Sequence, residues 1–241
     1  QKLYKKHHVK RELIPLVDKS ILKMNSLFLL TENVSEIREY IYNNITHICK
    51  YSFRLFGRLF VLHFSIFSLD DLPKYDSYAR VIVQMLALLG NNGSLKCSQT
   101  LHIYLSLTPF KKNMPSQRFL PITEEHVNSA HTYVCRKEGE IFIYREEEWL
   151  KVLIHECFHS FGLDFSNFES SHLNTSLKHF FKVNIDDFKV TEAYCEFWAV
   201  ILNSAFLSFR SSNNFSDFST YFHYIVQLEI TYSLLQVNKI L

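Results

Sequence analysis

Residues 146–162 read EEEWLKVLIHECFHSFG. The stretch opens with three glutamates, and negative charge stabilises the first turn of a helix. An apolar run then continues to Phe161, and Gly162 follows where a glycine commonly ends a helix. The pattern therefore predicts a helix that begins at Glu146 and ends before Gly162.

Within this predicted helix, His155, Glu156 and His159 form the pattern H-E-x-x-H. At 3.6 residues per turn, the two histidines project from one face about one turn apart, so their imidazoles can bind one zinc ion. Glu156 lies about 100° further round the helix, where it can reach a zinc-bound water as a general base. The alternative is a helix whose histidines are hydrogen-bonded in the core. Cys157 is expected to point into the core.

A catalytic zinc site of this type takes three protein ligands, which requires a third ligand downstream. The longer pattern H-E-x-x-H-x-x-G-x-x-H places that ligand at Phe165, and Asp164 misses the position by one residue, so this pattern fails. A second predicted helix carries Glu192 and Glu196 four residues apart, and their carboxylates share one face. Because that helix is otherwise largely apolar, two acids on it require a partner.

Together with H-E-x-x-H, these two glutamates resemble the pattern of the gluzincins, the thermolysin-like branch of the zinc metallopeptidases. The resemblance covers roughly residues 128–200. It implies a zincin-like fold, a Zn²⁺ cofactor, and hydrolysis of a peptide or protein substrate with Glu156 as general base. It also implies that Glu192 is the third zinc ligand and that Glu196 supports a ligand histidine, although the reverse assignment of the two glutamates stays open.

The same resemblance extends loosely to substrate binding. Asn128 and Ala130 stand where thermolysin-like enzymes carry an element that binds the substrate backbone, and the alternative is that they are ordinary turn residues. Gluzincins also use a tyrosine or histidine to stabilise the oxyanion. The candidates for that role, which the sequence does not rank, are Tyr221, His223, Tyr224 and Tyr232. The alternative for each of them is an aromatic residue that packs in the last helix.

Hydrophobic periodicity and turn residues predict an α+β protein. We expect a small mixed β-sheet with the H-E-x-x-H helix, followed by a helical C-terminal part. A single zincin-like domain over residues 1–241 is expected, with helices and sheet in 1–145 and the helical part in 146–241. The predicted helices are 34–51, 73–89, 191–209 and 217–239, the strands are 58–67 and 100–107, a hairpin joins 131–135 to 140–144, and a loop or short helix is inserted near 168–183.

The net charge of the 241-residue chain is only +2, so no strong field favours binding to nucleic acid or to an anionic membrane. We therefore expect neither as a partner. The first eleven residues are locally basic and form either a binding arm or a solvated terminus. Apolar runs fall short of the roughly 18 residues that a membrane span requires.

The five cysteines are odd in number, widely spaced and without CxxC pairing, which favours reduced thiols over a disulfide framework. Cys195 is expected to be a small core residue. A cytoplasmic location follows as an expectation. The abundance of Asn, Lys, Ile, Phe and Tyr resembles that of proteins from large DNA viruses and other AT-rich genomes, for which the host cytoplasm or the virion is the expected location.

Three functions are compatible with these residues. The first is a zinc peptidase, the second is a zinc-binding pseudopeptidase or peptide-binding module without turnover, and the third is a metal-free scaffold. Glu156 favours the first, because a protein that only binds its partner has no need of a general base.

Overall fold

The structure of this chain is a computed structural model that describes residues 8–18, 35–113, 115, 120, 123–165, 171–182 and 188–240. The chain divides into two compact units, Gln1–Asn167 and Phe168–Leu241. The sequence predicts one domain whose parts meet at residues 145 and 146, whereas the structural division falls after Asn167. The helix that carries H-E-x-x-H therefore belongs to the same unit as the sheet.

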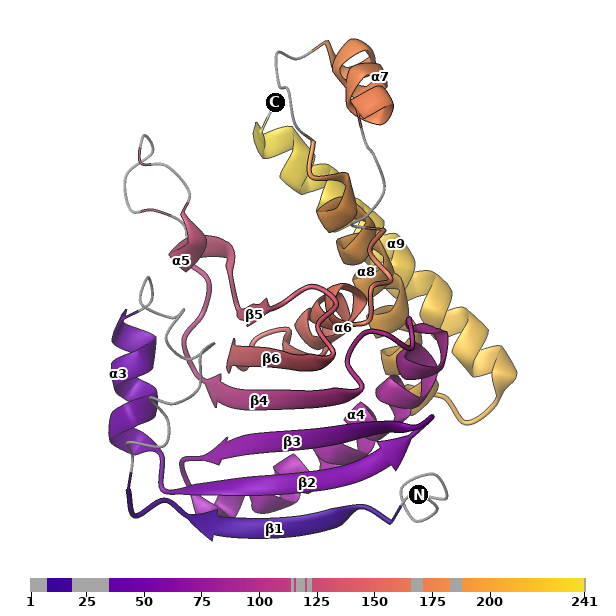
Figure 1. Cartoon of the computed structure of the whole chain (residues 1–241). Helices are drawn as coiled ribbons and strands as arrows, with labels where there is room; N and C mark the ends of the chain where they lie inside the picture. The colour runs from indigo at the N-terminus through magenta and orange to yellow at the C-terminus, as the bar shows by residue number, and fades with distance from the viewer. Residues whose placement is uncertain are drawn as a thin grey trace. The chain divides into compact units, whose positions relative to one another are not determined.

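The first unit is built on a six-stranded mixed sheet with the strand order β1-β2-β3-β4-β6-β5 (Figure 1). Strands β1, β2 and β3 pair antiparallel, β4 lies parallel to both β3 and β6, and β5 runs antiparallel to β6. The predicted strands and the hairpin are confirmed, with β5 shorter than predicted. The strands are β1 (Lys10–Pro15), β2 (His47–Leu55), β3 (Arg58–Ile66), β4 (Thr100–Thr108), β5 (Ala130–Thr132) and β6 (Glu138–Arg145).

Helices cover both faces of this sheet (Figure 1). Phe64 of β3 packs against Tyr75 of α4, with ring centroids 5.1 Å apart, and α4 packs against α6. Phe64 is in register with Ile143 of β6 through the strand between them, so both side chains face the same side of the sheet. Phe142, one residue before Ile143, faces the opposite side, where it packs against Ile41 of α3. The helical segments of this unit are α3 (Ser35–Asn44), η3 (Leu69–Asp71), α4 (Leu72–Asn92), α5 (Glu124–Val127) and α6 (Trp149–Ser160).

The stretch 34–51, predicted as one helix, is helical only as far as Asn44. β2 begins at His47, and Ile48 pairs with Ser65 of β3 while β1 pairs along the other edge of β2. The isoleucines recur at helical spacing, but hydrogen bonding to strands on both sides makes the second half of the stretch a strand within the sheet. The helix prediction is therefore wrong from Ile45 onward.

A buried arginine holds the turn that leads from α4 into β4. Arg58 is 2% exposed, and its guanidinium donates to several backbone carbonyls of this turn. Its Nη2 donates to the carbonyls of Gly93 and Ser94 at 2.9 and 2.8 Å, and its Nη1 donates to the carbonyl of Cys97. Charge-assisted hydrogen bonds of this kind are among the stronger ones in proteins. The turn around Cys97 is thus tied to β3.

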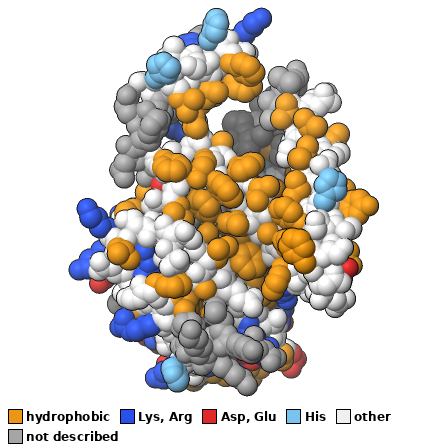
Figure 2. All heavy atoms as spheres, turned by 90° about the vertical axis from the view of Figure 1, so that its right-hand side faces the viewer, with side chains coloured by type: hydrophobic (Ala, Val, Ile, Leu, Met, Phe, Trp, Pro, Cys, Tyr) orange, Lys and Arg blue, Asp and Glu red, His pale blue; other side chains and the backbone are white. Residues whose placement is uncertain are grey.

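The second unit is helical and confirms the helices predicted in this region. α7 (Ser171–Phe181) comes first, and α8 (Val190–Ser211) packs along α9 (Phe215–Ile240). Hydrophobic side chains gather on the molecular face drawn in Figure 2. The large hydrophobic residues that α9 leaves exposed after its first turn are Tyr221, Tyr224, Leu228, Ile230, Tyr232, Leu234, Leu235 and Val237.

The architecture is α+β, as the sequence predicts. In the parts of the chain that the structure describes, every helix is too short or too polar to span a lipid bilayer. Of the basic N-terminal stretch, residues 1–7 lie outside the described residues. Lys10 and Arg11 belong to β1, so this end of the stretch is an edge strand rather than a free arm.

Candidate metal centre

Helix α6 begins three residues later than the sequence predicts, because Glu146, Glu147 and Glu148 precede it. Glu148 occupies the N-cap position with a positive φ of 56°. Glu146 pairs with Lys74 at 2.8 Å, and Glu148 pairs with Lys112 at 3.2 Å. Glu146 and Glu148 therefore anchor the connection between β6 and α6, and none of the three acids lies in the first turn of the helix.

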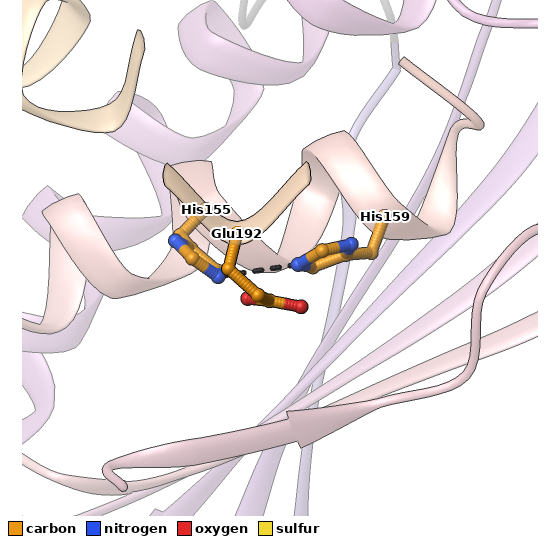
Figure 3. A group of neighbouring side chains, drawn as sticks. All are labelled: His155, His159 and Glu192. Atoms are coloured by element: carbon orange, nitrogen blue, oxygen red, sulfur yellow. Dashed lines mark hydrogen bonds between the residues drawn. The ribbon is translucent and has the colours of Figure 1, made fainter. Parts of the chain in front are cut away.

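The two histidines of H-E-x-x-H face each other on α6 (Figure 3). His155 Nε2 and His159 Nε2 are 3.2 Å apart. Two nitrogens that bind one tetrahedral zinc ion at its usual bond length lie about 3.3 Å apart. The separation thus fits a pair of ligands to one ion. His159 is buried, whereas His155 is partly exposed.

A buried carboxylate fixes the orientation of His159. Asp164 Oδ2 lies 2.8 Å from His159 Nδ1, and Asp164 is only 1% exposed. The chain reaches this position by reversing at the end of α6. Gly162 has a φ of +65°, and the N–H of Leu163 donates to the carbonyl of Phe158 at 2.8 Å. This is the turn by which a glycine commonly closes a helix, and it returns the Asp164 side chain to the last helical turn.

The Asp164 contact decides which nitrogen of His159 is available to a metal. An ionised carboxylate only accepts hydrogen bonds, so in a neutral imidazole bonded to one the proton lies on Nδ1 of His159. Its Nε2 then carries a lone pair and points at Nε2 of His155. Two imidazole nitrogens that face each other at 3.2 Å need either a proton or a cation between them. This donor set suits a metal ion that takes neutral imidazole ligands, such as zinc.

Glu192 is the third member of a group of side chains that could hold a metal ion. One ligand atom from each of His155, His159 and Glu192 lies within 4.8 Å of the other two (Figure 3). Over the described ranges, no other group of three His, Cys, Asp or Glu side chains meets that condition. Glu192 stands in the first turn of α8 with an exposed side chain. The histidine pair and Asp164 lie in the first unit, and Glu192 lies in the second.

The remaining residues of the motif lie as the helix geometry requires. Glu156 is partly buried, and Cys157 is fully buried, which confirms that it is a core residue. Burial raises the pKa of the Cys157 thiol well above its usual value, and the negative charge of Glu156 adds to this effect. Because the thiolate is the form that binds metals, Cys157 is a poor ligand beside two imidazoles.

The carboxylate that contacts His159 is Asp164, whereas the resemblance to gluzincins implies this kind of role for Glu196. Glu196 lies one turn after Glu192 on α8, with an exposed side chain, and its support of a ligand histidine stays a prediction. Cys195 is buried, as predicted. The sequence carries one signal for Asp164, which is the helix-ending Gly162 two residues before it.

Strand β5 forms the edge of the sheet beside α6, against which it packs. Ala130 is 7% exposed and is in register with Ile143 of β6, and Asn128 is partly exposed. Between them, Ser129 Oγ is buried and has no hydrogen-bond partner among the described residues. Substrate binding by Asn128 and Ala130 stays a prediction.

The four candidates for oxyanion stabilisation all lie on α9 with exposed side chains. The exposed fractions of the three tyrosines run from 41% at Tyr221 to 64% at Tyr224. A catalytic role for any of the four stays a prediction.

A disulfide bond joins Cys97 to Cys135, with the Cα atoms 4.5 Å apart. The prediction of five reduced cysteines is therefore wrong, and the cysteines no longer favour a reducing compartment. Thr100 pairs with Glu138 across the parallel strands β4 and β6, and each cysteine comes three residues before one of them. Parallel register thus brings the two sulfur atoms together. The cysteines that remain free and buried are Cys49, Cys157 and Cys195.

Replacing Asp164 by asparagine is expected to weaken zinc binding about 10- to 100-fold, as losses of such supporting groups do at other zinc sites. Asparagine keeps the shape of the side chain but loses the charge that favours the Nδ1–H tautomer of His159. Competition with a chromogenic chelator measures the dissociation constant. Asp70→Asn, at an exposed position in η3, is the matched control. Equal affinity in the two variants would show that Asp164 does not support the metal ligand.

Comparison with known proteins finds no family whose pattern the chain matches, no curated protein of similar sequence and no solved structure that resembles it.

Proposed function

We propose that this chain is a zinc-dependent peptidase of the gluzincin type, with a zincin-like fold. The observation that carries the proposal is the facing pair of Nε2 atoms of His155 and His159, 3.2 Å apart, with Asp164 on the outer nitrogen of His159. A histidine that merely fills a core has no need of a buried carboxylate that selects its tautomer. The H-E-x-x-H pattern adds Glu156 beside this pair.

Each of these residues has a defined part in hydrolysis. When bound, zinc acts as a Lewis acid on the scissile carbonyl and lowers the pKa of its bound water to about 7. Glu156 takes the proton of the attacking water and passes it to the leaving amine nitrogen. Asp164 holds His159 in the tautomer that presents a lone pair. Because the helix carrying His155, Glu156 and His159 is packed on the sheet, their spacing is kept through the reaction.

Glu192 is proposed as the third zinc ligand. The resemblance to gluzincins supports this role. The distances support it as well, because a carboxylate oxygen of Glu192 lies within 4.8 Å of a ring nitrogen of each histidine. Glu196, four residues later on the same helix, is proposed to support a ligand histidine from outside the metal.

Glu192→Ala is expected to lower zinc affinity about 100-fold, and Glu196→Ala about tenfold, because loss of a ligand costs more than loss of its support. The absorption spectrum of the cobalt-substituted protein is expected to change in Glu192→Ala and to stay near wild type in Glu196→Ala, since only a ligand alters the coordination sphere. The opposite ranking of the two variants would reverse the assignment. Wild-type zinc affinity and cobalt spectra in both variants would show that neither glutamate of α8 belongs to the site.

The proposed substrate is a peptide or an unfolded protein segment. Strand β5 ends the sheet next to α6, and an extended peptide can add to such an edge through backbone hydrogen bonds. Asn128 and Ala130 stand on or beside this strand and are proposed to contact the substrate backbone. The low net charge gives no reason to propose nucleic acid as a partner.

The test is hydrolysis of a peptide library by the zinc-loaded protein. We expect cleavage products that disappear on treatment with a chelator and return when zinc is added back. Zinc binding without cleavage would favour the alternative, a zinc-binding pseudopeptidase or peptide-binding module. Failure to bind zinc at neutral pH would contradict both and leave a metal-free scaffold.

A further inference from the structure

The Cys97–Cys135 disulfide lies against the turn that carries Asp164. A Cβ atom added to Gly162 would lie 3.0 Å from Cys97 Sγ and 3.6 Å from Cys135 Sγ. Both sulfur atoms therefore pack on the glycine that ends α6. Asp164 follows that glycine by two residues, and its carboxylate bonds His159. Only the Gly162 turn separates the bridge from the His159–Asp164 pair.

Cys135 also forms a backbone hydrogen bond with α6, the ligand helix that carries His155 and His159. Its N–H donates to the carbonyl of His159 at 3.1 Å, and the N–H of Gly162 donates to the same carbonyl at 3.1 Å. The loop between β5 and β6 thus meets α6 at the residue whose side chain faces the metal position. A constraint on the position of Cys135 is therefore expected to constrain the last turn of α6 as well.

The Cys97 half of the bridge is anchored independently. Arg58 donates to the Cys97 carbonyl, and Ser98 Oγ donates to the Ser160 carbonyl at 2.8 Å. On the other half, the carbonyl of Arg136 accepts from the N–H of Ser98. None of these hydrogen bonds involves a cysteine sulfur atom, so we expect them to persist when the bridge is opened. The expected consequence of opening it is local loosening around Cys135 and Gly162, with the sheet intact.

We infer that the Cys97–Cys135 disulfide is a positioning element of the metal centre, so that zinc affinity depends on the thiol–disulfide state of these two cysteines. This inference rests on the proposed zinc site. In the bridged state, the disulfide restricts the Gly162 turn and so keeps the Asp164 carboxylate in contact with His159. In the reduced state, this restriction is absent and the contact that favours one tautomer of His159 is weaker.

The reductant is a dithiol, and the exchange balances without a further reactant. One thiolate of the dithiol attacks Sγ of Cys135, which is the more exposed of the two cysteines, and Cys97 leaves as a thiolate that takes up a proton. The second thiol of the dithiol then displaces Cys135 from the mixed disulfide. Two electrons pass to the protein, and the dithiol becomes a cyclic disulfide. By reciprocity, bound zinc favours the bridged state.

The test compares zinc dissociation constants, measured by chelator competition, for bridged wild type and for Cys97→Ser/Cys135→Ser. Wild type that is reduced and then freed of dithiol under anaerobic conditions is measured beside them, because dithiols chelate zinc. Both unbridged forms are expected to bind zinc about tenfold or more weakly, as loss of ligand support does elsewhere. Cys49→Ala, at a free buried cysteine in β2, is expected to bind as wild type does.

A second comparison separates positioning from general support of the fold. The cysteine pair is replaced in the Asp164→Asn background. If the bridge acts through Asp164, the two losses do not add, and the combined variant binds about as weakly as Asp164→Asn alone.

Equal affinities with and without the bridge, or fully additive losses, would overturn the inference. Loss of the native circular dichroism spectrum in both unbridged forms would also overturn it, because the bridge would then have a purely structural role. A bridged wild type that binds no zinc would contradict the proposed function instead.

Discussion

Replacing Glu156 by glutamine is expected to lower kcat for peptide hydrolysis about 10³-fold while the zinc content stays at the wild-type level. Glutamine keeps the size of the side chain but cannot take a proton from water. Zinc binding is expected to persist because the proposed ligands are other residues. Steady-state kinetics on a cleavable peptide and elemental analysis of the same preparation measure the two quantities together.

Glu138→Gln is the matched control for this experiment. Glu138 is an exposed acid at the start of β6, so the same chemical change is made on the same unit away from the ligand helix. This variant is expected to keep the wild-type kcat. Full activity of Glu156→Gln would show that another group is the base, and loss of zinc from it would give Glu156 a part in binding the metal.

Replacing His155 by alanine is expected to reduce zinc affinity at least about 100-fold. Protein zinc sites contribute roughly 10 kcal/mol or more over four ligands, so loss of one ligand corresponds to about 3 kcal/mol. His155 is partly exposed on a packed helix, and the truncation leaves its buried face intact. Chelator competition measures the affinity, and the circular dichroism spectrum is expected to stay that of the wild type.

The control for His155→Ala is a histidine from a second pair. His63 Nε2 and His102 Nδ1 lie 3.1 Å apart on β3 and β4, nearly the same separation as in the H-E-x-x-H pair. Burial, together with the positive charge of neighbouring His102 and Lys50, lowers the pKa of His63 to about 3. No third metal-binding side chain of the described residues joins this pair at ligand distance.

His63→Ala is therefore expected to leave zinc binding unchanged. The comparison tests whether the buried carboxylate and the third group, and not the mere closeness of two imidazoles, make a metal site. Equal loss of zinc from His63→Ala and His155→Ala would contradict the assignment of the site to α6.

Much of the ligand helix is predictable from local sequence alone. The helix, the shared face of its histidines and its end at Gly162 follow from periodicity and from the conformational freedom of glycine, and the structure has all three. The start of the helix is not predictable in this way. The acids at 146–148 fit a first helical turn equally well, and only the backbone, with a positive φ at Glu148, shows that they precede it.

The supporting groups of the site were missed because they depend on tertiary structure. Asp164 reaches His159 only after the chain reverses at Gly162. The bridge between Cys97 and Cys135 requires β4 and β6 to lie side by side in parallel, which no local pattern reveals across 38 residues. The sequence identifies residues that can bind a metal, whereas the fold identifies those that orient them.

The most direct test of the proposed centre is X-ray absorption at the zinc edge of the protein loaded with one equivalent of zinc. We expect a first shell of about four nitrogen or oxygen atoms at about 2.0 to 2.1 Å, with the outer-shell scattering of two imidazole rings and no sulfur. A shell without imidazole scattering, or one that contains sulfur from a cysteine, would contradict a site built on His155 and His159.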